Sequence, residues 1–78
     1  MYVIYTRNEQ GELVYFTGRT EKSKGIRKAN MTRTGNVKLF SSVNSVLKAR
    51  KKLEKNCITQ SPFIATTAKA YIRDRWGV

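Results

Sequence analysis

Apolar and basic side chains follow a helical spacing between residues 41 and 57. At about 100° per residue, the apolar side chains fall on one arc: Val43, Val46, Leu47, Leu53 and Cys57. The lysines fall together on the opposite arc: Lys48, Lys51, Lys52 and Lys55. Ser41 or Ser42 can cap the N-terminus, and the helix dipole favours cations near the C-terminus. The pattern predicts a helix over about 42–55, with one face for a core and the other for an anion.

Two residues on the apolar arc have further chemistry. Arg50 can pack its aliphatic stem there while the guanidinium reaches an edge, or it can pair with a partner outside the chain. Cys57 is the single cysteine, so an internal disulfide is excluded and a reducing compartment is favoured. We expect Cys57 to be a small buried hydrophobe.

The first 19 residues predict a β-hairpin. Residues 2–7 and 13–19 are rich in Tyr, Val, Ile, Phe and Thr, and a short polar span with Gly11 separates them. Both faces of this hairpin carry apolar groups, so either helices cover both sides or one side meets a partner. Its tyrosines can be core residues, which is the commoner role, or can stack on RNA bases.

The rest of the chain is less regular. Residues 20–36 lose strand-like alternation and predict a long basic loop, with which a one-turn helix over 26–30 is compatible. Residues 37–40 predict a third strand. Ser61 and Pro62 are typical of a helix start, so we expect a helix over about 62–76, although threonines and alternating apolar residues there also permit a strand.

These elements indicate an α+β fold in one domain, residues 1–78. We expect a three-stranded antiparallel sheet in the order β-β-β-α-α, with the lysine-rich amphipathic helix packed on it. That packing is expected to bury four side chains of the helix: Val43, Val46, Leu47 and Leu53.

Charge adds a functional expectation. The chain has 16 Lys and Arg against 5 Asp and Glu, a net charge of +11, and such a chain attracts polyanions. Between residues 13 and 53 Glu21 is the single acidic residue. A basic surface without specific function is the alternative interpretation.

The composition argues against catalysis. The chain lacks His, the commonest general acid–base, and one Cys without His gives no zinc site of familiar spacing. The five glycines fit no phosphate-loop or dinucleotide spacing, so we expect no enzyme, metal or cofactor. No apolar run is long enough for a membrane span, and Met1 leads straight into strand-like sequence without a secretory signal. The predicted location is the cytoplasm.

Three stretches before the lysine-rich helix carry a resemblance: YVIY, ELVYFTGR and VKLFSS. Over about the first two-thirds of the chain, this arrangement resembles the small accessory proteins that large T4-type bacteriophages make early in infection. Its size and basicity are similar to those of phage inhibitors of the ToxN ribonuclease toxin, which are associated with RNA-containing inhibitory complexes. The resemblance implies an antitoxin acting on a host defence in the host cell cytoplasm.

Two hypotheses for function follow. The first is a non-catalytic nucleic-acid-binding protein, with RNA favoured over DNA, that contacts phosphates through nine residues: Lys22, Lys24, Arg27, Lys28, Arg33, Lys48, Lys51, Lys52 and Lys55. The second is a protein-directed inhibitor of a host nuclease or toxin that binds an acidic surface, with Tyr15 or Trp76 as anchors. A homodimer is compatible with both, and a genome-packing protein is a third, structural interpretation.

Overall fold

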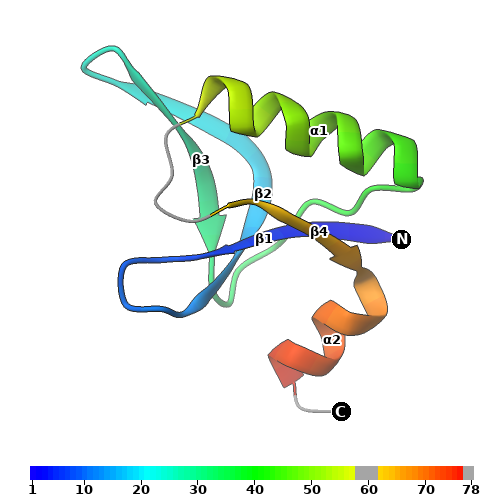
Figure 1. Ribbon diagram of the computed structural model, residues 1–78. Coiled ribbons are helices and arrows are strands. Elements are labelled where there is room, and N and C mark those ends of the chain that lie inside the picture. The colour runs from blue at the N-terminus through cyan, green and yellow to red at the C-terminus, as the bar shows by residue number, and fades with distance from the viewer. Residues whose placement is uncertain (58–61, 77–78) are drawn as a thin grey trace.

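The chain folds into a four-stranded antiparallel sheet with two helices (Figure 1). The computed structural model describes residues 1–57 and 62–76, with side chains as far as Arg73. Its elements are β1 (Tyr2–Arg7), β2 (Leu13–Ser23), β3 (Ile26–Thr32), α1 (Val43–Asn56), β4 (Ile64–Thr67) and α2 (Ala68–Trp76). The strand order is β3-β2-β1-β4. The α+β class is therefore confirmed, whereas the expectation of three strands is wrong.

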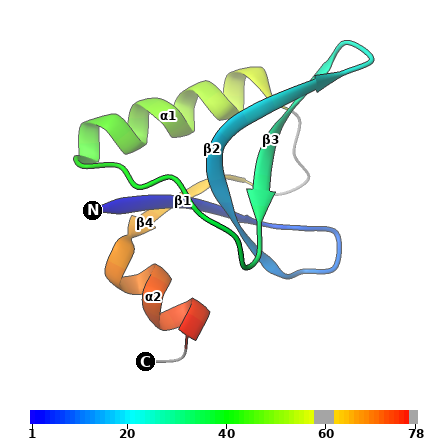
Figure 2. The same ribbon diagram turned by 180° about the vertical axis from the view of Figure 1, so that it is seen from behind.

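The two helices lie on opposite faces of the sheet (Figures 1 and 2). Alternation along β1 directs Ile4 to the α1 side and Val3 to the α2 side, and both side chains are fully buried. This arrangement explains the apolar groups on both faces of the hairpin, because each face has its own helix. None of the described helices is long and apolar enough to cross a membrane.

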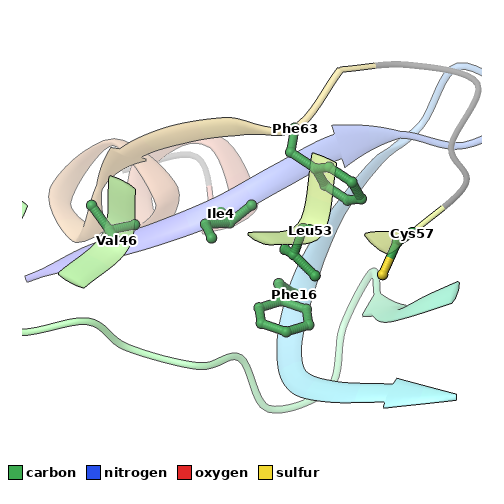
Figure 3. Packing of buried hydrophobic residues seen from close by; sticks show 6 residues of the cluster. All are labelled: Ile4, Phe16, Val46, Leu53, Cys57 and Phe63. Atoms are coloured by element: carbon green, nitrogen blue, oxygen red, sulfur yellow. The ribbon is translucent and has the colours of Figure 1, made fainter. Parts of the chain in front are cut away.

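The larger core lies between the sheet and α1. Figure 3 shows its buried side chains: Ile4, Phe16, Val46, Leu53, Cys57 and Phe63. Ser42 caps α1 and forms a reciprocal capping box with Ser45, which confirms the predicted cap. Cys57 follows the last turn and is buried, as expected.

Two of the four helix residues expected in this core lie outside it. Val43 and Leu47 are 48% and 41% exposed, whereas Leu53 is 4% exposed. Helical geometry places Val43 and Leu47 about 60° and 100° around the axis from Val46. They therefore lie on the flank of the apolar arc, beyond the reach of a sheet that packs against its centre.

The second core lies on the α2 side and contains tyrosines. Val3, Tyr15 and Tyr71 are buried together, and the rings of Tyr15 and Tyr71 meet edge to face with centroids 4.7 Å apart. Tyr5 lies at the margin, 6.1 Å from Tyr15. Tyr15 is therefore a core residue, and its predicted alternative roles in base stacking or partner binding are wrong.

The predicted basic loop over 20–36 is wrong, because most of it belongs to a hairpin. β2 continues to Ser23 and pairs with β3 through a two-residue turn of Lys24 and Gly25, both at positive φ. Such a turn matches the twist of the flanking strands. The one-turn helix over 26–30 is wrong for the same reason.

Residues 37–40, predicted as a strand, form only an isolated bridge. The backbone N–H and C=O of Phe40 each bond Tyr2 at 2.8 Å, and the N–H of Lys38 donates to the C=O of Phe16 at 2.8 Å. β1 pairs with β2 only from Tyr5 to Arg7. The 37–40 segment thus occupies the space where the two strands diverge.

The helix predicted over 62–76 is confirmed for Ala68–Trp76 and is wrong for Ile64–Thr67, which form a strand. β4 pairs with β1 from Tyr2↔Thr67 to Tyr5↔Ile64, so tertiary pairing selects the strand alternative that its threonines permitted. The helix starts at Ala68, where Thr67 Oγ1 accepts a bond from the N–H of Ala70 at 3.2 Å. The predicted cap at Ser61 lies outside the described residues.

The α1 packing predicts a contrast between two leucines. Leu53→Ala removes a buried side chain and should lower the free energy of unfolding by about 2–5 kcal/mol, comparable to the whole stability expected at this size. The matched control Leu47→Ala, on the exposed flank, should cost about 1 kcal/mol or less. Chemical denaturation followed by circular dichroism measures both, and equal losses would contradict the packing.

Candidate nucleic-acid interface

The β2–β3 hairpin bends away from the sheet at Gly18. The β2–β3 register shifts between Phe16 and Thr20, and Gly18 lies at φ +96°, a conformation that L side chains rarely adopt. Such a bulge bends and twists the strand. The part of the hairpin beyond Gly18, residues 18–30, is called the ribbon below, and it extends past the C-terminal end of α1 (Figures 1 and 2).

A groove of about 600 Å³ lies between the ribbon, the 37–40 segment and the C-terminal half of α1. We call it the basic groove, and its lining residues are Phe16, Gly18, Thr20, Arg27, Lys38, Phe40, Ala49, Lys52, Leu53, Asn56 and Cys57. Its floor is apolar, since Phe16, Leu53 and Cys57 also belong to the main core. These lining residues include three cations and no carboxylate.

The three cations come from three different parts of the chain. Arg27 belongs to β3, and its Nη1 donates to Thr20 Oγ1 across the ribbon at 3.0 Å. Lys38 extends from the 37–40 segment, with Nζ 6.0 Å from the centroid of the Phe40 ring. Lys52 lies on α1, where helical geometry places it beside the lining residue Ala49. Positive charge therefore surrounds the groove from three sides.

The two faces of the ribbon differ in charge. Lys22 is directly opposite Arg27, so two cations share the face that lines the groove, and like charges in this position are destabilising. On the other face Lys28 is opposite Glu21, whose Oε1 also accepts a bond from Asn30 Nδ2 at 2.8 Å. The one carboxylate of the ribbon, that of Glu21, therefore offsets positive charge on the face away from the groove.

The structure brings together only part of the predicted site. Lys52 and Arg27 line the basic groove, and Lys22 lies next to Arg27. The other six predicted residues lie elsewhere. Lys24 is in the turn at the tip of the ribbon, and Lys28 is on its far face. Lys48, Lys51 and Lys55 lie on the side of α1 opposite its core, are exposed, and do not line the groove.

Two arginines form ion pairs away from the groove. Arg33 follows β3 at the end opposite the tip and pairs with Glu12. Arg50 Nε lies 3.8 Å from Glu54 Oε1, one turn along α1, and this buried nitrogen has no hydrogen-bond partner. Arg50 thus has an ion-pair partner within the chain, and pairing with a partner outside the chain stays a prediction.

Among the three groove cations, Lys38 is the one absent from the predicted site. The VKLF pattern predicted a strand, in which Lys38 would be one solvated residue among many. A local signal was present, because Lys38 lies two residues before Phe40, and alternation places two such side chains on the same side of an extended segment. Its position opposite Arg27 and Lys52 depends on the bond to Phe16, which no local pattern reveals.

The geometry suits an anion with an apolar portion. Among the side chains that the structure describes, no group of three or more His, Cys, Asp or Glu could hold a metal ion.

No protein-family model matches the chain, and the comparisons with curated proteins and with solved structures find no match. The groove itself is therefore the feature that indicates a function.

The bulge predicts the effect of a methyl group at Gly18. A Cβ there would lie 3.3 Å from the Cβ of Lys38 and in a strained conformation, so Gly18→Ala should cost about 1 kcal/mol or more and displace Lys38. Gly11→Ala is the matched control, because Gly11 has positive φ but no atom within 4 Å of the added Cβ. Both variants should lose stability in denaturation, and only Gly18→Ala should shift the amide NMR signals of residues 37–40. Unchanged signals there would contradict the close approach.

Proposed function

We propose that this protein is a non-catalytic nucleic-acid-binding protein that holds the phosphate backbone in the basic groove, with RNA the favoured polymer. The observation that carries the proposal is the convergence of Arg27, Lys38 and Lys52 on one groove without a lining carboxylate. Phosphates are the anions that Arg and Lys most commonly bind on nucleic acids.

Electrostatic attraction would drive this binding. Lys22 and Arg27 repel each other across the ribbon, and a phosphate placed between the ribbon and α1 would relieve that repulsion. Binding would also release the cations condensed on the polymer, which adds affinity at low salt. The exposed lysines of α1 would attract the polymer over a longer range. RNA is favoured because its unpaired regions expose the backbone in shapes that can enter a concave site.

Matched charge variants test the location of the site. The triple variant Arg27→Gln, Lys38→Gln and Lys52→Gln should weaken binding to single-stranded RNA at least about tenfold, because all three cations line the groove. The control Lys48→Gln, Lys51→Gln and Lys55→Gln removes the same charge from the outer side of α1 and should weaken binding about threefold or less. Fluorescence anisotropy at one salt concentration measures both. Equal losses of affinity in the two variants would indicate that binding depends on net charge alone.

The salt dependence tests the mechanism. If about six phosphates are engaged, log affinity against log salt should have a slope near −4 on single strands. The groove triple variant should make this slope less steep by about 2, since each lost phosphate contact changes it by about 0.7. Anisotropy titrations between about 50 and 200 mM salt measure the slope. A slope near zero for the unmodified protein would refute phosphate binding.

The phage resemblance extends the proposal to a target. We propose that the protein acts as an antitoxin against a host defence ribonuclease toxin of the ToxN type, bridged to it by a shared RNA. A direct protein contact is the second candidate, and the exposed pair Val43 and Leu47 on the flank of α1 favours it. The alternative anchor Trp76 has a side chain outside the described part of the structure.

Nuclease treatment separates these two routes. The tagged protein should retain a purified toxin of this class only while RNA is intact, and should lose it after treatment with an unrelated ribonuclease that is then inhibited. Retention after RNA removal would favour direct contact, and no retention in either condition would reject the toxin as the target.

A further inference from the structure

We infer that the basic groove receives one unstacked base of a single strand, with the phosphates beside that base held by the cations of the rim. This inference rests on the proposed function and names its ligand more closely: an unpaired nucleotide segment. The groove volume of about 600 Å³ lies in the range of about 300–1,000 Å³ typical of pockets for small organic ligands. The backbone alone would need no such recess.

The apolar floor is the feature that phosphate binding leaves unexplained. Phe16, Leu53 and Cys57 form it as part of the core, and the half-buried Phe40 and Ala49 form its walls. A base has two apolar faces that pack on such surfaces, most favourably on aromatic rings. Because the floor belongs to the core, its shape is already formed before a ligand enters.

Three cations line the same groove as the apolar floor, so they can hold the phosphates beside an inserted base. Arg27 and Lys52 approach from the ribbon and from α1, on either side of the floor, and Lys38 enters beside the Phe40 ring. Asn56 adds an amide at the same groove, and amides can bond the edge of a base. Apolar packing and anion binding thus coincide in one recess.

A duplex cannot satisfy this site without distortion. Its bases are paired and stacked, and turning one outward costs unpairing and unstacking energy. The inference therefore predicts that single strands bind more tightly than duplexes of equal charge. An acidic peptide would satisfy the cations but not the apolar floor, so it should bind more weakly.

The decisive experiment compares strands that differ only in their bases. Fluorescence anisotropy competition uses four probes of matched charge: a single-stranded RNA of about sixteen nucleotides, the same strand with every base removed, an RNA duplex of about eight base pairs and poly-glutamate of about sixteen residues. The single-stranded RNA should bind about tenfold tighter than the abasic strand, which corresponds to one stacked base. It should also bind tighter than the duplex and poly-glutamate.

A variant that narrows the groove tests whether the preference for bases arises there. Ala49→Leu narrows the recess without changing charge and should reduce the ratio of RNA affinity to abasic-strand affinity to near one. Asn44→Leu, on the exposed side of α1, is the control that adds the same side chain outside the groove and should retain the preference. The probe comparison on the unmodified protein decides the inference even if Ala49→Leu fails to fold.

The outcomes separate this inference from the proposed function. Equal affinity for the RNA and the abasic strand would overturn base insertion and leave phosphate binding standing. Equal affinity for poly-glutamate and RNA would overturn base insertion in favour of a general polyanion or protein site. Failure to bind any nucleic acid would overturn both proposals.

Discussion

The divergence of β2 from β1 is the constraint on which the site depends. The two strands pair only from Tyr5 to Arg7, after which the bulge at Gly18 turns β2 away with β3. The backbone groups left open by this divergence would be costly if unpaired. Residues 37–40 satisfy some of them through bonds to Tyr2 and Phe16. The inserted segment lines the groove through Lys38 and Phe40, together with the ribbon and α1.

Three of the acidic residues have partners away from the groove, so they do not compensate its charge. Glu12 pairs with Arg33, and Glu54 pairs with Arg50, while Glu21 lies on the ribbon face away from the groove. Exposed ion pairs of this kind contribute little stability, about 0–1 kcal/mol. Their larger effect is to keep negative charge away from the groove, which raises its attraction for an anion.

Stability and function share side chains in this small domain. The residues that form the groove floor are packed between the sheet and α1 (Figure 3), and the second core around Tyr15 and Tyr71 fixes the opposite face. Close packing allows these side chains little freedom to rearrange. The recess is therefore formed by the same contacts that hold the fold together, whereas the cations at its rim are exposed.

The sequence alone determined the elements with strong local patterns: the first hairpin, the capped helix α1, the burial of Cys57 and the need to cover both sheet faces. Tertiary structure decided the rest. Residues 26–32 form a strand because a two-residue turn pairs them with β2, although their charges obscure the alternation. Ile64–Thr67 form a strand because β1 offers an edge. The grouping of Arg27, Lys38 and Lys52 required the β2–β3 pairing and the bond from Lys38 to Phe16, since residues distant in sequence meet only after backbone pairing has placed their segments together.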